Sequence, residues 1–344
     1  MKRGYMERNA ALVSEELLAR RQAALVSHFD EYGVDAVVVF GDVADADELH
    51  YISNLGPYWG NATCVLNKKG ERFLVTGMTA RVNFWVSMMT GVEMDNIRSA
   101  GPKVNEAAAK YLKETYPDGG TIGMVGEYFP ADMQTAIEAA GFSTVWMQDV
   151  VEKAMETRDT GYRETLFKGI GLMKNAFADA LKGAGSDGRS MQQITADVEY
   201  ACRTAGAMDC YLLAGDESLV FAKAEDKQAE GPWTLYALLQ YLGEWIPIIR
   251  NTDASKNREA FAVRDVILAA LKPCTAELTW EENGWHVAIC NQTRSDHAAF
   301  AYTGTATLVP GQVISIRICN PQQGILIEDM VVIEENGSKL LTNI

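Results

Sequence analysis

The sequence predicts an α/β domain followed by an α+β domain, and three observations support this. In the first half, short apolar runs alternate with helical patterns, as in sheets covered by helices. After residue 155, two long helical patterns come first and strands then dominate, which favours helices on one face of a mostly antiparallel sheet. The 344 residues are also enough for two domains, each with its own core. We therefore place the domains at residues 1–155 and 156–344.

The first half opens with a helical pattern from Ser14 to Tyr32, in which Ser14 is a suitable N-cap and Gly33 ends the pattern. The apolar run from Asp35 to Phe40 then predicts a strand that is buried on both faces. The other predicted elements of this half are strands at 62–66 and 72–76, joined as a hairpin, strands at 121–125 and 144–147, and helices at 79–89, 103–115 and 131–140.

The second half begins with two predicted helices, Thr160 to Lys182 and Ser190 to Ala205, separated by the glycine-rich turn Gly183 to Gly188. Strands follow, interrupted by one helix. They are predicted at 210–213, 233–242, 245–250, 285–290 and 299–302, with the helix at 256–271, and the chain ends in a hairpin of strands within 308–317 and 327–337 and a last short strand.

Composition and charge exclude several classes of partner. The apolar content of 48% and charged content of 22% are those of a globular protein. The net charge of −15 argues against nucleic acid and anionic membrane surfaces, because polyanions are bound by Lys and Arg. The six cysteines have no C-x-x-C spacing, and no apolar run reaches the length of a membrane helix. We expect a cytoplasmic protein with no membrane or nucleic-acid partner.

Several motifs resemble those of one known family. The segment Leu308-Val-Pro-Gly, the strand that ends at Arg317 and the triplet Ile327-Glu-Asp329 resemble the end of the catalytic domain in the creatinase, aminopeptidase P and prolidase family, the "pita-bread" fold. Gly33-Val-Asp-Ala and Tyr51-Ile-Ser-Asn-Leu resemble that family's N-terminal domain. The resemblance spans nearly the whole chain. It implies a creatinase-type first domain, a pita-bread second domain and a homodimer.

The resemblance also implies where a metal site would lie. The family's peptidases hold two metal ions with two Asp, one His and two Glu. The matching positions here, in that order, are Tyr236, Pro247, His286, Arg317 and Glu328. Only the histidine and the last glutamate are of the ligand type, and an arginine stays protonated and repels cations. We therefore expect no metal and no cofactor.

The resemblance to the metal-independent creatinase implies a clamped zwitterionic substrate and a histidine that moves the proton. The family's base histidine has no counterpart between Ser218 and Asp226, so either His286 takes this role, or Lys223 or Asp226 does, or no residue does. We predict His286 and Glu328 as catalytic residues, with Glu328 orienting the imidazole or a water, and Arg317 as a clamp for a substrate anion. The further predicted substrate-binding residues are Tyr236, Trp245, Arg250, Tyr58 and Trp59, and His297 is a minor candidate.

Each of these residues has a structural alternative. His286 lies in an apolar run, as a hydrogen-bonded core histidine would, and Arg317 and Glu328 are able to form a buried ion pair. Trp245 suits a core, and Arg250 an internal salt bridge. Three functions remain open: a metal-independent enzyme that cleaves a C–N or similar bond in a small polar or zwitterionic substrate, an inactive pseudo-peptidase used for binding or assembly, and a dinuclear-metal Xaa-Pro peptidase.

Overall fold

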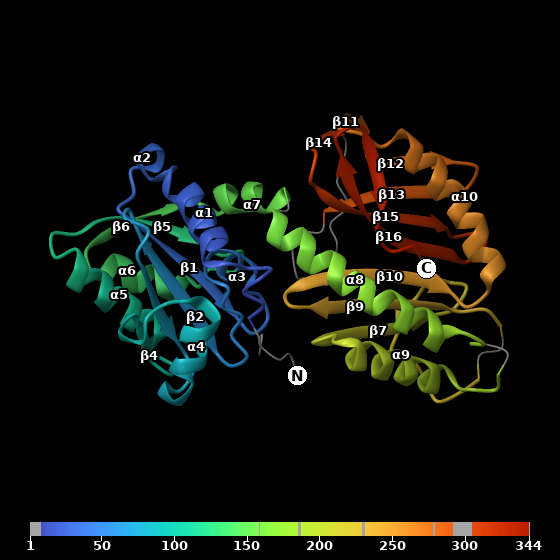
Figure 1. Ribbon diagram of the computed structural model, residues 1–344, viewed down its shortest axis with the longest axis horizontal. Coiled ribbons are helices and arrows are strands. Elements are labelled where there is room, and N and C mark those ends of the chain that lie inside the picture. The colour runs from blue at the N-terminus through green and yellow to red at the C-terminus, as the bar shows by residue number, and fades with distance from the viewer. Residues whose placement is uncertain are drawn as a thin grey trace. The chain divides into compact units, whose positions relative to one another are not determined.

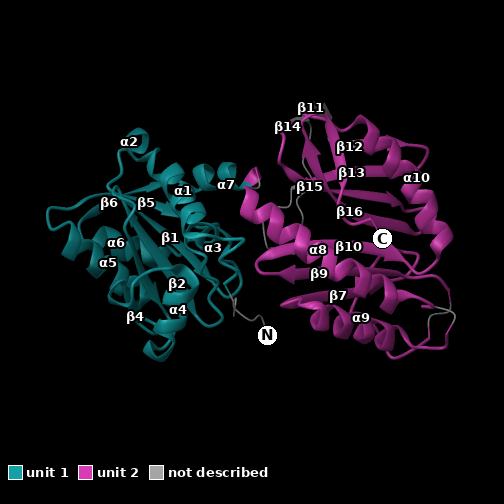
Figure 2. Ribbon diagram, viewed as in Figure 1, with its two compact units in different colours: residues 1–155 teal, residues 156–344 magenta. Residues whose placement is uncertain are grey.

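The computed structural model describes residues 8–157, 159–184, 187–228, 231–277, 279–291 and 305–343. The predicted strand at 299–302 and His297 lie outside these ranges. The chain forms two compact units, residues 1–155 and 156–344, which Figure 2 shows in different colours. No helix in the described ranges is both long and apolar enough to cross a membrane.

Unit 1 is built on a mixed six-stranded sheet with the strand order β4-β3-β2-β1-β5-β6 (Figure 1). The strands are β1 (Ala36–Asp42), β2 (Asn61–Asn67), β3 (Arg72–Thr76), β4 (Ile97–Ser99), β5 (Gly120–Val125) and β6 (Phe142–Trp146). The helices are α1 (Glu15–Val26), α2 (Phe29–Tyr32), α3 (Asp47–Ser53), α4 (Asn83–Thr90), α5 (Val104–Thr115), α6 (Ala131–Ala139) and α7 (Gln148–Glu156), with short 3₁₀ turns at Ala80–Val82 and Met94–Asn96.

The expected features of unit 1 are largely present. Strand β1 is buried along almost its whole length, and β2 and β3 form the predicted antiparallel hairpin. Ser14 caps α1 by accepting a hydrogen bond from the backbone N–H of Leu17. The single helix predicted from Ser14 to Tyr32 is instead two helices. The Ser27 hydroxyl between them donates to the carbonyl of Ala24, and such local bonds compete with continued helix.

Unit 2 contains a nine-stranded sheet in which every described pairing is antiparallel. Its main strand order is β12-β13-β15-β16-β10-β9-β7-β8, with β17 also paired to β16. The strands of unit 2 are β7 (Asp209–Gly215), β8 (Phe221–Ala222), β9 (Thr234–Tyr241), β10 (Glu244–Asn251), β11 (Cys274–Glu277), β12 (Thr279–Glu282), β13 (Trp285–Asn291), β14 (Thr305–Leu308), β15 (Val313–Asn320), β16 (Ile325–Glu334) and β17 (Gly337–Leu340). The helices are α8 (Thr160–Leu181), α9 (Met191–Ala205) and α10 (Ala254–Ala270), and β11 pairs with β14 in a second, two-stranded sheet.

Three helices cover one face of this sheet with two apolar cores. Helices α8 and α9 pack against alternate residues of β9 and β10, such as Leu239 and Ile248. Helix α10 packs against alternate residues of β13, β15 and β16, such as Ile289, Ile316 and Ile327. Because neighbouring residues along a strand point to opposite faces, the residues between these lie on the other face of the sheet. We call this other face the site face.

Gly169 brings α8 close to the sheet, and this gives a first testable prediction. A Cβ at Gly169 would lie 2.8 Å from Cβ of Tyr241 and 3.0 Å from Cδ1 of Ile246, whereas Gly171 in the same helix has nothing within 4 Å. We expect Gly169→Ala to lower the free energy of unfolding by about 1–3 kcal/mol through overpacking. Gly171→Ala should raise it by about 0.5–1 kcal/mol through helix propensity. Urea denaturation of both variants measures the difference, and equal effects would contradict this packing.

Candidate ligand-binding site

Three of the predicted site residues lie together in one row across the sheet. Tyr236 pairs with Ile249, Ile249 with Glu328, and Glu328 with Arg317. Directly paired residues of antiparallel strands point to the same face, so Tyr236, Glu328 and Arg317 all lie on the site face. The row continues from Arg317 to Ala288 on β13. The structure therefore brings Tyr236, Arg317 and Glu328 together from three separate strands.

Glu328 and Arg317 form an ion pair at the centre of this row. Glu328 is completely buried, and its Oε2 accepts hydrogen bonds from Nε and Nη2 of Arg317 at 3.1 and 2.9 Å. Its other oxygen, Oε1, accepts from the Ser315 hydroxyl at 2.6 Å. Burial alone would lower the pKa of Arg317, but the Glu328 carboxylate outweighs that effect and the pKa is raised. Both carboxylate oxygens are thus already bonded within the chain.

Ser315 was not among the predicted site residues. It lies two residues before Arg317 on β15, and the register pairs it with Cys290 on β13. The period-2 alternation of a strand would have placed Ser315, Arg317 and Cys319 on one face. That alternation is the signal from which Ser315 could have been found.

Tyr236 and Cys290 are held in their neutral forms beside the ion pair. Burial, followed by the negative charge of Glu328, raises the pKa of Tyr236 to about 12, while Arg317 opposes the rise. The same causes raise the pKa of the Cys290 thiol to about 11. At neutral pH the site therefore presents a phenol, a thiol and a hydroxyl around a single buried ion pair.

His286 lies away from this centre. The register pairs His286 with Cys319, so it shares the site face but stands two residues along β13 from Ala288, roughly 7 Å by strand geometry. Its ring is about half exposed, and Nδ1 lies 3.0 Å from Oε1 of Glu281. We expected Glu328 to orient this imidazole, but the hydrogen bonds differ. Glu281 bonds the ring, and Glu328 is bonded to Arg317 and Ser315.

Arg250 lies on the helix-covered face. It is buried, and its Nη2 contacts Oδ1 of Asp329 at 2.5 Å and donates to the carbonyl of Thr342 at 3.0 Å. Arg264 contacts the other oxygen of Asp329 at 2.9 Å. The internal salt bridge considered for Arg250 is therefore present, and it explains Arg250 without a substrate. Its predicted role in substrate binding is not supported by this position.

The other predicted substrate-binding residues are one residue of β10 and two residues of unit 1. Trp245 is buried on β10, four residues from Ile249, which is roughly 13 Å along a strand. Tyr58 and Trp59 belong to unit 1, where the Tyr58 ring packs edge-on against Trp85 at 5.4 Å and Trp59 is 67% exposed. Contact of these three residues with a ligand remains a prediction.

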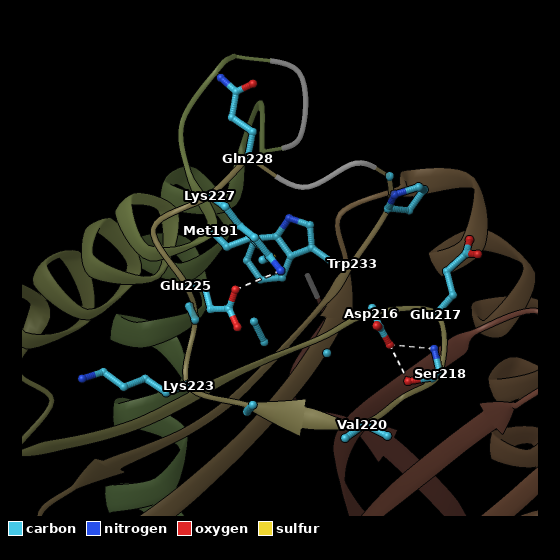
Figure 3. A pocket seen from close by; sticks show the side chains of 16 residues that line it. Met191, Asp216, Glu217, Ser218, Val220, Lys223, Glu225, Lys227, Gln228 and Trp233 are labelled. Atoms are coloured by element: carbon cyan, nitrogen blue, oxygen red, sulfur yellow. Dashed lines mark hydrogen bonds and ion pairs between the residues drawn. The ribbon is translucent and has the colours of Figure 1, made fainter.

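A separate pocket of about 760 Å³ lies where β7, β8 and β9 meet the start of α9 (Figure 3). Trp233 lines this pocket, and some of the polar groups around it are bonded to one another. Lys227 pairs with Glu225 at 2.9 Å, and Asp216 accepts from the backbone and hydroxyl of Ser218. Lys223, an alternative proton carrier, also lines this pocket, and its side chain extends away from Trp233 in Figure 3. These groups belong to a different part of the sheet from the row of Tyr236, Glu328 and Arg317.

Comparison with solved structures identifies the fold. The chain is similar to the X-Pro aminopeptidase from Thermotoga maritima, with 20% identity, a TM-score of 0.71 and coverage of 94% of this chain and 97% of that one. The Xaa-Pro dipeptidase from Bacillus anthracis shares 18% identity, with a TM-score of 0.72 and coverage of 95% and 98%. The prolidase from Pyrococcus furiosus shares 18% identity, with a TM-score of 0.70 and coverage of 94% and 99%.

These likenesses define the class of structure: the chain has the fold of the Xaa-Pro peptidases and prolidases, the pita-bread fold. The fold predicted from the sequence is confirmed over nearly the full length of both chains. No protein-family model matches the sequence, and no curated protein sequence matches it either.

The residues present do not fit the dinuclear metal centre that this fold implies. Two of the five matching positions are unable to bind a metal ion. Arg317 is a cation that is already paired with the Glu328 carboxylate, and the Pro247 side chain has no atom that could coordinate a metal. Tyr236 stays protonated at neutral pH, so His286 and Glu328 are the two matching positions that keep a usual ligand group. Within the described ranges, no group of three or more His, Cys, Asp or Glu is placed to hold a metal ion. A second cation would have to compete with Arg317 for one buried carboxylate.

Proposed function

We propose that unit 2 carries a metal-independent binding site for a small anionic or zwitterionic molecule, anchored by Arg317. The observation that carries this proposal is the Arg317–Glu328 ion pair at positions where this fold would otherwise place two metal ligands. The Arg317 side chain is 31% exposed, and Nη1 donates no hydrogen bond within the described residues. Two N–H groups on Nη1 are therefore open to an anion, which a guanidinium binds with good geometry.

Binding without turnover is the function that the geometry supports best. A general base needs a lone pair near the reacting proton, and both oxygens of Glu328 are engaged by Arg317 and Ser315. His286, another candidate base, has Nδ1 bonded to Glu281 and stands two residues along β13 from Ala288, which pairs with Arg317. The cytoplasmic location and the homodimer remain predictions.

A second candidate is a metal-independent enzyme that hydrolyses or eliminates at a C–N bond. It is favoured by the position of His286 on the same face of the sheet as Arg317. In this case His286 would move the proton through Nε2, with Glu281 orienting the ring through Nδ1. His286→Ala would then abolish turnover of the substrate and leave the fold intact.

The test compares metal content and peptidase activity. Purified protein is incubated with Mn²⁺, Co²⁺ or Zn²⁺, desalted and analysed for bound metal, and then assayed for proline release from Xaa-Pro dipeptides. A metal-dependent prolidase treated in the same way is the positive control. We expect substoichiometric metal and no proline release, because Arg317 occupies the remaining carboxylate. Stoichiometric metal together with proline release would overturn the proposal and establish the dinuclear peptidase.

A further inference from the structure

Three aromatic rings form a cluster on the site face beside the ion pair. The ring centroids of Tyr211 and Tyr236 are 6.4 Å apart with the planes at 87°. Those of Phe221 and Tyr236 are 5.9 Å apart at 61°. Tyr211 is 39% exposed, and the other two rings are partly buried. None of the three belongs to the apolar cores under the helices.

Gly215 allows this cluster to form. Phe221 on β8 pairs with Gly215 on β7, and β7 separates β8 from Tyr236 on β9. A Cβ at Gly215 would lie 2.9, 3.0 and 3.2 Å from three atoms of the Phe221 ring. The ring therefore lies directly on the glycine backbone and reaches across β7 to Tyr236. A side chain at 215 would prevent this contact.

Tyr236 joins the cluster to the ion pair. It belongs to the same row as Glu328 and Arg317, and three strand spacings separate the backbones of Tyr236 and Arg317, roughly 14 Å. Both side chains are long, and the charges of Glu328 and Arg317 both affect the pKa of the Tyr236 hydroxyl. A molecule only a few atoms long would therefore reach from the rings to the guanidinium.

The aromatic cluster and Arg317, at the two ends of this site, favour different chemical groups. Ring faces carry negative charge density, so a cation held beside a cluster of aromatic rings is attracted to them. A quaternary ammonium suits such a site because it has no N–H groups that would need acceptors. At the other end, Nη1 of Arg317 offers two N–H groups to a carboxylate.

We propose that this face binds a betaine-like molecule, a short carboxylate that carries a quaternary ammonium group. The ammonium lies among the rings of Tyr211, Tyr236 and Phe221, and the carboxylate contacts Arg317. This names the ligand class of the proposed binding function and rests on it.

Calorimetry on the full chain tests the proposal with four carboxylates that share a four-carbon chain and differ in the group on its last carbon. The first is 4-(trimethylammonio)butanoate. The others are 4-aminobutanoate, the isostere 5,5-dimethylhexanoate, in which an uncharged tert-butyl group replaces the trimethylammonium, and butanoate. We expect the trimethylammonium probe to bind about 5–30-fold tighter than the isostere, since a partly desolvated cation–π contact contributes about 1–2 kcal/mol. Equal affinity for probe and isostere would show that the rings bind only apolar groups, and would overturn the ligand class.

Variants separate the two ends of the site. Phe221→Leu and Gly215→Ala should each lower the affinity for the trimethylammonium probe several-fold and leave the affinity for butanoate unchanged. Phe221→Tyr should leave the affinity for the trimethylammonium probe unchanged. Circular dichroism checks that each variant is folded. Arg317→Met should abolish binding of all four probes. If Arg317→Met leaves binding intact, the anion anchor of the proposed function fails. If Arg317→Met abolishes binding but Phe221→Leu and Gly215→Ala do not change it, Arg317 is confirmed as the anion anchor and the aromatic binding site is contradicted.

Discussion

Asp329→Ala should be the most destabilising single substitution in unit 2, with an expected loss of about 4 kcal/mol or more. Asp329 is 1% exposed and bonds two guanidiniums, those of Arg250 and Arg264, which are themselves 3% and 6% exposed. The Thr342 hydroxyl also donates to it at 2.8 Å. Removing the carboxylate leaves two buried cations close together, with the exposed Asp265 still bonded to Arg264, and neither cation can lose its proton. Such an arrangement costs far more than the interaction energy of an exposed pair.

Asp265 is the matched control for this prediction. It also bonds Arg264, at 3.0 Å, but its side chain is 65% exposed. Asp265→Ala should therefore change the free energy of unfolding by about 0.5 kcal/mol or less. Urea denaturation followed by circular dichroism measures both variants. A midpoint for Asp329→Ala close to that of Asp265→Ala would show that the buried network does not stabilise the fold.

The two-domain α/β and α+β organisation could be predicted from local pattern, and the pita-bread fold and the positions of the site from motifs that resemble one family. The pattern around Arg317 and Glu328 predicted two neighbouring strands. Once two such strands pair, residues at matched positions must share a face. The ion pair at 317 and 328 was accordingly among the considered alternatives.

The surroundings of the site depend on pairings that local pattern does not contain. The position of His286 follows from the register of β13 against β15, and a slip of two residues would leave every apolar residue on its own face. Phe221 lies on a strand of two residues, which is too short to give a periodic signal. Its contact with Tyr236 crosses an intervening strand at Gly215. The position of His286 and the Phe221–Tyr236 contact could therefore be found only from the structure.

Arg317→Met should lower the free energy of unfolding by about 2–4 kcal/mol, because it leaves the Glu328 carboxylate buried without a cation. The Ser315 hydroxyl would then be the remaining donor shown to contact that carboxylate. The loss should fall below that of Asp329→Ala, since the Arg317 side chain is 31% exposed and water can enter where it stood. Urea denaturation of the single variant gives the value.

The double variant Arg317→Met, Glu328→Gln separates stability from function. It contains no buried unpaired charge, so it should recover most of the stability lost in Arg317→Met, as replacement of buried ion pairs by neutral groups commonly does. It should still fail to bind butanoate, because the guanidinium is absent. A double variant that is stable and does not bind would show that Arg317 is retained for an anion. One that stays as unstable as Arg317→Met would mean that the ion pair is chiefly a structural replacement for the metal centre of this fold.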